Sequence, residues 1–156
     1  MPKNPTTGDA QVILQLYDLR RESEMRKART WWFASFWPQS ADDFMKVLNE
    51  VGTPENAWLR QVMGYWEMAA AIAVQGAVNQ ELFLVPSFSG EMFNVFAKVR
   101  PFLGELRKKL GNPKLLTNIE TLINRSKNGR EYLKQVEVRL AARRKVMMEA
   151  ASAKAS

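Results

Sequence analysis

The chain has 156 residues and a formal net charge of +7 at pH 7. It contains no cysteine and no histidine, which excludes thiol nucleophiles, Ser-His triads, thiolate zinc sites and imidazole acid–base chemistry. Hydrophobic residues make up 46% of the chain, an ordinary share for a globular protein, so one domain with one core is expected. No motif assigns a catalytic residue, a metal or a cofactor.

The N-terminal half of the sequence is predicted to be helical. Residues 1–9 are polar and predicted to be disordered, and apolar residues at three- and four-residue spacing then predict one long helix over residues 10–36. Ser40 and two following aspartates predict a short helix to about residue 51, since such residues cap and stabilise a helix N-terminus. Thr53 and Pro54 open a further helix over residues 54–78. Because that segment is apolar on nearly every side, we expect it to be the buried central helix.

The C-terminal half continues the helical pattern. A single turn is expected near residues 82–85. A helix is expected from residue 87 or 89 to about 110, with a kink or a break near Val99 caused by Pro101. Further helices are predicted over residues 113–125 and 131–150, with a frayed tail at residues 151–156. The predicted fold is all-α: a single-domain bundle of five to seven helices around the helix at 54–78.

The longest uncharged run, residues 68–80, is too short to cross a bilayer, which takes about 20 apolar residues. The N-terminus also lacks the apolar stretch of a secretory signal. The sequence therefore predicts a cytoplasmic protein without a membrane span.

Glu67 is the most informative charged residue, because it lies in the most apolar predicted helix. An ionised carboxylate there must be paired, exposed or protonated. A buried ion pair with Arg107 or Arg100 is the preferred interpretation. A partly exposed glutamate and a ligand-contacting carboxylate are the alternatives.

Aromatic residues gather at the end of the first predicted helix and surround it on every side. At least one ring is expected to face away from the core, and an apolar surface patch marks an association site. The members of this candidate association surface are Trp31, Trp32, Phe36 and Trp37. Homodimerisation is the simplest use of such a surface, and a ligand pocket lined by these rings is the alternative.

The charge is unevenly distributed, with +2 in residues 1–39, −5 in residues 40–91 and +10 in residues 92–156. The preferred interpretation is an acidic segment that packs beside a basic one, within one chain or across a dimer. The alternative is a basic face for nucleic acid or another polyanion. Its candidate contacts are Arg139, Arg143, Arg144 and Lys145.

Two segments carry a resemblance to a known family. They are the run Val62–Ala69, continued through Gly76–Leu82, and the run Phe96–Arg107. Together they resemble a bacterial all-helical family of uncharacterised function, over about residues 40–125. The resemblance implies a helical fold and no activity, and it favours Arg107 over Arg100 as the partner of Glu67. Asn79 stands where the family has aspartate, and we do not expect the membrane anchor that often precedes the family's domain.

We therefore expect a non-catalytic helical protein that works through association, as a homodimer. A nucleic-acid or polyanion binder that uses the basic C-terminal half is the first alternative. A small-molecule binder or enzyme centred on Glu67 is the second.

Overall fold

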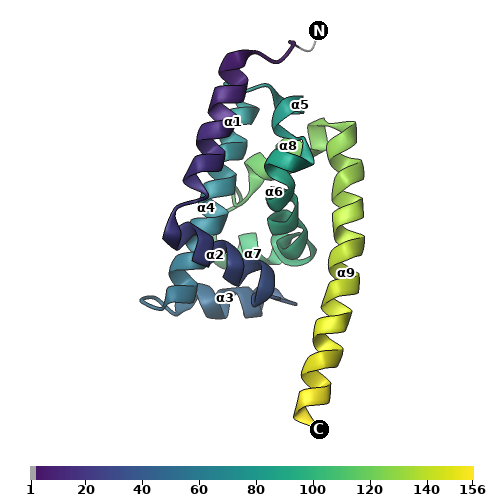
Figure 1. The fold of residues 1–156 in the computed structure, drawn as a ribbon. Helices are drawn as coiled ribbons and strands as arrows, with labels where there is room; N and C mark the ends of the chain where they lie inside the picture. The colour runs from purple at the N-terminus through teal and green to yellow at the C-terminus, as the bar shows by residue number, and fades with distance from the viewer. Residues whose placement is uncertain (1–2) are drawn as a thin grey trace.

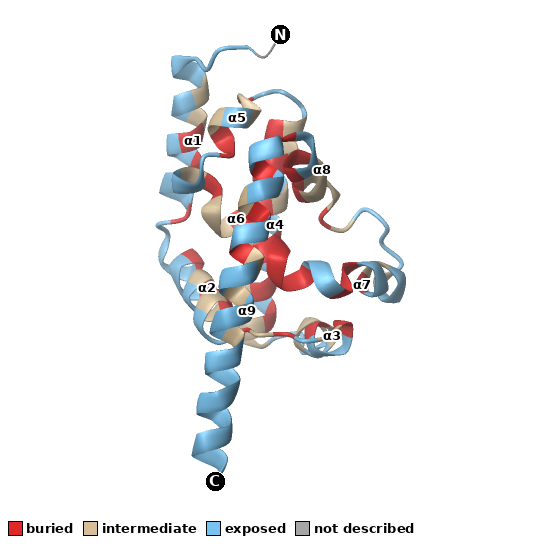
Figure 2. Cartoon of the chain, turned by 90° about the vertical axis from the view of Figure 1, so that its right-hand side faces the viewer, coloured by how far each residue is buried: buried red, intermediate tan, exposed pale blue. Residues whose placement is uncertain are grey.

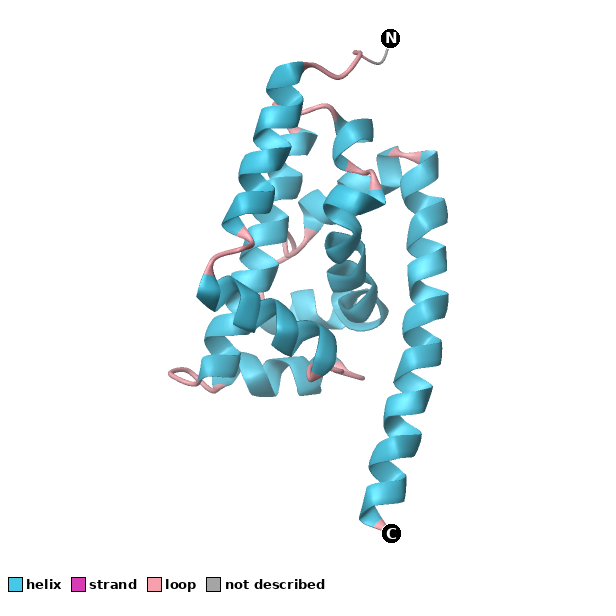
Figure 3. Ribbon diagram, in the orientation of Figure 1, coloured by secondary structure: helices cyan, strands magenta, loops and turns pink. Residues whose placement is uncertain are grey.

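The computed structural model describes residues 3–156, and every regular element in that range is a helix (Figures 1 and 3). In chain order these elements are α1 (Thr7–Leu19), α2 (Ser23–Ala34), α3 (Ala41–Asn49), α4 (Pro54–Val74), α5 (Gln80–Phe83), α6 (Pro86–Val99), the 3-10 turn η1 (Arg100–Phe102), α7 (Leu103–Leu110), α8 (Thr117–Arg125) and α9 (Lys127–Ala155). The all-α class is confirmed. The helices outnumber the five to seven expected, because two predicted helices are each divided.

The single helix predicted over residues 10–36 is wrong, because the chain breaks between α1 and α2. Glu22 adopts a non-helical conformation there, and its carboxylate accepts hydrogen bonds from the backbone N–H groups of Glu24 (3.1 Å) and Met25 (2.9 Å). Glu22 thus caps α2, which the apolar spacing alone does not reveal. The other end of α1 also differs from expectation. Thr6 and Asp9 form a capping box, so α1 begins inside the segment predicted to be disordered. Met1 and Pro2 lie outside the described residues.

The kink predicted near Val99 is confirmed. The helix α6 ends at Val99, and Pro101 lies in the turn η1 that leads into α7. Proline lacks the N–H that the next helical hydrogen bond needs, so the chain changes direction at this point. The caps predicted for α3 and α4 are confirmed as well: Ser40 and Thr53 accept from Asp43 N and Asn56 N.

The core lies between α4, α6 and α8, with α2 and α3 packed against α4 and with α9 packed against α6 and α8 (Figure 2). The helix α4 packs against helices on several sides, but it is not buried all round. A strip of its surface is exposed, at Ala57, Gln61, Gly64 and Met68. The more completely buried helix is α6, in which every residue from Val95 to Val99 is buried. The helix predicted over residues 54–78 therefore lies among the other helices, as expected, but one strip of its surface is exposed.

The helix α9 runs along the outside of α6 and then projects past the rest of the chain (Figures 1 and 2). Leu133 and Val136 bury its inner side, whereas residues 145–156 are exposed. The predicted frayed tail is helical up to Ala155. No helix among residues 3–156 is long and apolar enough to cross a membrane.

Candidate functional site

Glu67 holds the N-terminus of α8. Its carboxylate accepts hydrogen bonds from the backbone N–H groups of Asn118 (3.0 Å) and Ile119 (3.2 Å), and from the side-chain amide of Asn118 (2.9 Å). The residue before α8, Leu116, is buried in the left-handed conformation (φ +57°) and offers no side-chain cap. Glu67 therefore supplies from α4 the acceptor that the first turn of α8 lacks, at the positive end of the helix dipole.

The structure does not bring Glu67 together with either arginine considered for it. Arg107 donates to Glu120 (2.5 Å) and to the carbonyl of Leu115 (3.0 Å). Arg100 pairs with Glu137 of α9 (2.6 Å). The charge of Glu67 is balanced by backbone N–H groups, so it needs no guanidinium beside it.

The aromatic residues of the candidate association surface belong largely to the core. Trp32 and Phe36 are buried. Trp31 stacks on Phe36 with 4.6 Å between ring centroids, and Trp37 is half-buried over the ammonium group of Lys98. The surface expected from the sequence thus keeps only Trp31 and Trp37 as partly accessible residues.

Lys98 is a buried cation that the sequence analysis did not single out as a site. Its Nζ donates to the carbonyl oxygens of Trp32 (2.5 Å) and Phe36 (2.8 Å), at the C-terminal end of α2. Burial, with added repulsion from Arg144 and Arg143, lowers the pKa of Lys98 to about 7. The signal available in the sequence was a lone lysine within a run of five residues that are otherwise apolar.

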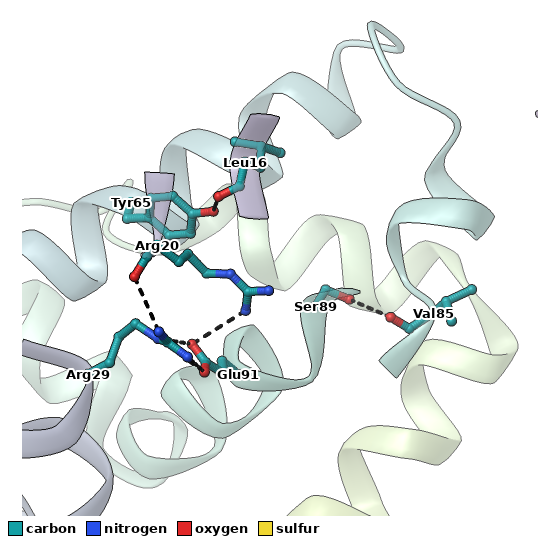
Figure 4. Close-up of polar contacts among 7 residues, drawn as sticks. All are labelled: Leu16, Arg20, Arg29, Tyr65, Val85, Ser89 and Glu91. Atoms are coloured by element: carbon teal, nitrogen blue, oxygen red, sulfur yellow. Dashed lines mark hydrogen bonds and ion pairs between the residues drawn. The ribbon is translucent and has the colours of Figure 1, made fainter. Parts of the chain in front are cut away.

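A second charge cluster lies beneath α2, with Arg20 buried and with Arg29 and Glu91 half-buried (Figure 4). Glu91 of α6 accepts from Arg29, whose Nε lies 2.9 Å from the nearer carboxylate oxygen, and it also lies 3.5 Å from Arg20. We call Arg20, Arg29 and Glu91 the Glu91 cluster. Arg20 is only 6% exposed, stacks over the rings of Tyr17 and Trp66, and has no acceptor for its Nε among residues 3–156. Within the same part of the chain, Glu91 is therefore the only acid that offsets the buried charge of Arg20.

Tyr65 lies beside this cluster and donates its hydroxyl hydrogen to the carbonyl of Leu16. Burial raises the pKa of Tyr65 to about 12. The bond joins α4 to α1 near the point where the chain turns into α2. The Glu91 cluster and Tyr65 together fix the position of the α1–α2 break, and nothing in this arrangement requires a ligand.

The candidate polyanion contacts on α9 separate into two kinds. Arg144 is half-buried and donates to the carbonyl of Pro38 (3.0 Å), and Arg139 stacks over Tyr132 at 5.4 Å. Arg143 and Lys145 are exposed. Arg143 lines a depression that it shares with α2.

That depression is one of two that adjoin on the outer side of α2. The first has a volume of about 660 Å³ and is lined by Ser23, Arg26, Lys27, Thr30, Trp31, Ser35 and Trp58. The second has a volume of about 410 Å³ and is lined by Arg26, Arg29, Thr30, Phe33, Ala34 and Arg143. They share Arg26 and Thr30, so we describe them together as the α2 groove. Both are open to solvent.

The cations of the α2 groove differ in whether they already have a partner. Lys27 pairs with Glu24 (2.7 Å), and Arg29 belongs to the Glu91 cluster. The carboxylate beside each cation raises its pKa. Arg26 and Arg143, in contrast, form no ion pair with any residue from 3 to 156. The sequence analysis missed Arg26, although its spacing of four from Thr30 places both on one face of a helix.

The described residues hold no group of three or more side chains with metal-ligating spacing. The α2 groove instead combines arginines, hydroxyl groups and two tryptophans. These groups can bind an anion and contact a flat ring, and none is placed beside a second group in a way that points to a particular reaction.

Comparison with known proteins gives one match. No curated protein and no solved structure matches the chain. Residues 5–126 match a domain of unknown function, DUF4760, which confirms the resemblance seen in the sequence and extends it toward the N-terminus. The match includes α1 to α8 and ends where α9 begins, so Arg26 and Trp58 lie within it and Arg143 lies beyond it. The chain belongs to the DUF4760 family.

Proposed function

We propose that this protein is a binding protein for a polyanion, which it holds in the α2 groove. The observation that carries the proposal is that Arg26 and Arg143 come from two different helices, line one depression and lack carboxylate partners among residues 3–156. Guanidinium groups recognise phosphate and sulfate groups through two parallel hydrogen bonds. An anionic group between these two arginines would provide the partner that the described chain does not.

Two acids at the start of α2 support the proposal, because both are already engaged. Glu24 pairs with Lys27, and the carboxylate of Glu22 accepts from the backbone at the start of α2. These hydrogen bonds hold the pKa of Glu22 below its usual value. Neither acid is paired with Arg26, so its guanidinium remains available to an incoming anion.

The test is retention on a heparin column as a function of salt. We expect the protein to be retained at low salt and to elute over a narrow salt range, because exposed charges are screened by salt. Arg26→Gln combined with Arg143→Gln should elute at clearly lower salt. Lys145→Gln is the matched control, since Lys145 is an exposed cation on α9 outside the groove, and it should elute close to the unchanged protein. No retention at low salt, or equal losses in the control and the double variant, would overturn the proposal.

A second candidate function, association as a homodimer, is supported by the projecting part of α9. The stripe of Leu133, Val136 and Leu140 that packs on the body continues as Met147 and Ala151, which are exposed. Helical segments without tertiary contacts are marginal in water. A second copy that packs on this stripe would stabilise it. Sedimentation should then show a dimer that Met147→Glu dissociates, and a strict monomer at high concentration would contradict this candidate.

A further inference from the structure

We propose that the polyanion held in the α2 groove is a single-stranded nucleic acid, whose bases stack on Trp31 and Trp58 while its phosphates meet Arg26 and Arg143. This inference rests on the proposed function and adds the class of ligand. Positive charge alone suits any polyanion. The arrangement of aromatic rings and hydroxyl groups beside that charge is what selects among them.

The two tryptophans form a fixed platform at one end of the groove. Trp31 of α2 and Trp58 of α4 have ring centroids 6.2 Å apart with their planes tilted by 46°, and both side chains are half-buried. The inner side of Trp31 is stacked on Phe36 at an interplanar angle of 22°. Rings that the core already holds lose little conformational freedom when a base stacks on them, which favours binding.

The cations and hydroxyl groups extend from this platform along α2. Arg26 and Thr30 line both depressions, so they lie between the tryptophans and Arg143. Ser23 and Ser35 add hydroxyl groups to the depression that holds the tryptophans. A chain that alternates flat bases with sugar and phosphate groups needs this sequence of contacts: rings for bases, hydroxyl groups for sugars, and guanidinium groups for phosphates.

The open shape of the groove favours a strand over other anionic ligands. A small molecule is usually enclosed over most of its surface, and neither depression encloses a ligand in this way. The faces of the bases in a duplex are covered by their neighbours, so a duplex could use the arginines and not the tryptophans. A sulfated sugar chain has no aromatic ring to stack. Both therefore serve as comparisons for the role of Trp31 and Trp58.

The experiment measures fluorescence anisotropy of a labelled 12-nucleotide oligo(dT), a duplex of the same length, and heparin as competitor, all at one salt concentration. We expect the single strand to bind about tenfold or more tightly than the duplex, since stacking of one base is worth about this much. Trp58→Leu should lower affinity for the strand by about tenfold, and it should shift elution from heparin far less than Arg26→Gln with Arg143→Gln does. Trp58→Phe, which keeps a ring, should recover part of the affinity. Arg26→Gln with Arg143→Gln should lower the affinity for both the strand and heparin. It should also reduce the slope of log affinity against log salt concentration for the strand, by about 0.7 for each phosphate that the variant no longer neutralises.

The unaltered protein provides a second readout that does not depend on how Trp58 variants fold. Oligonucleotides that carry 5-bromouracil should quench intrinsic tryptophan fluorescence on binding, and the matched brominated duplex should quench much less. Equal affinity for strand and duplex, or an absence of quenching, would overturn the inference. If heparin elution still depended on Arg26 and Arg143, the proposed function would stand without it. Failure to bind heparin as well would remove both.

Discussion

Arg26 and Arg29 of α2 are only three residues apart, but they differ in whether a carboxylate is paired with them. Arg29 also lines the second depression of the α2 groove, but its guanidinium reaches toward α6, where Glu91 accepts from it and where Arg20 shares the same carboxylate. Arg26 faces solvent, where it lines the α2 groove with Arg143 and pairs with no acid from residues 3–156. A charge inside the fold needs a partner, because the energy of removing it from water is otherwise not recovered. An exposed arginine needs none, which leaves it free to bind a ligand.

The largest expected effect concerns the inner side. Glu91→Gln removes the acid of the Glu91 cluster and leaves Arg20 and Arg29 with uncompensated charges beneath α2. Breaking a buried pair in this way lowers the free energy of unfolding by about 3–5 kcal/mol. Urea denaturation measures the loss. Glu24→Gln is the control, because its pair with Lys27 is exposed and screened by solvent, so its loss should hardly change the free energy of unfolding. Heparin elution of Glu91→Gln should not move to lower salt. A loss below about 1 kcal/mol would show that the two sides of α2 do not differ as described.

The helices could be predicted from the sequence wherever a local signal marks their ends. Ser40, Thr53 and Pro101 act through their own side chains or ring, so their effects follow from residues nearby in the chain. The break at Glu22 and the start of α8 at Thr117 depend on less common devices. A glutamate cap and a left-handed Leu116 have no strong sequence signature, and α8 takes its cap from a helix about fifty residues away.

The candidate site was less predictable, because it is made by contacts between helices that are distant in the chain. Arg143 could be assigned to a basic helix, but its position beside Arg26 depends on how α9 packs. The same limit applies to Trp31 and Phe36, whose aromatic character indicated association and whose packing places one of them in the core. The nearly uniform apolar character of α4 was also misleading, since alanine occupies exposed as well as buried positions of that helix.

A smaller effect is expected at Glu67, whose partners are backbone groups. Glu67→Gln keeps an oxygen that can accept a hydrogen bond but loses the charge at the N-terminus of α8. We expect the free energy of unfolding to fall by about 0.5–2 kcal/mol, the range for a helix cap and its dipole interaction. This loss should be smaller than that of Glu91→Gln, because no opposite charge is left unpaired.

A double-mutant cycle with Arg107→Gln separates this cap from an ion pair. If Glu67 acts through α8 alone, the two substitutions should be additive to within about 0.5 kcal/mol. A coupling well above that value would mean that Glu67 and Arg107 interact in solution. In that case the pairing favoured by the family resemblance, and not the cap, would explain the carboxylate.

The effect expected at Lys98 is small for each pH unit. Lys98 is buried like Arg20, but it pairs with no acid from residues 3–156. Its pKa is lowered from 10.5 to about 7, so between those pH values the unfolded chain binds a proton that the native protein has lost. Stability should therefore rise with pH in this window, by at most about 1.4 kcal/mol per pH unit. Urea midpoints at several pH values between about 6.5 and 9.5, a range that covers most of this window, measure the rise.

Two variants test whether Lys98 causes this pH dependence of stability, and Tyr65 sets its upper end. Lys98→Met should flatten the rise, whereas Lys109→Met should leave it, because Lys109 is a surface cation whose pKa is raised by Asp42. Above about pH 10 the trend should reverse. The unfolded chain then loses the proton of Tyr65, which the native protein keeps until about pH 12, so stability falls as pH rises. A rise that persists in Lys98→Met would assign it to another group, and Lys98 would then be a charged cap of α2 at neutral pH. Lys98 of α6 and Arg29 of α2 thus differ in their partners. Arg29 is held by an acid, whereas Lys98 is held by carbonyl groups that also accept from its neutral form.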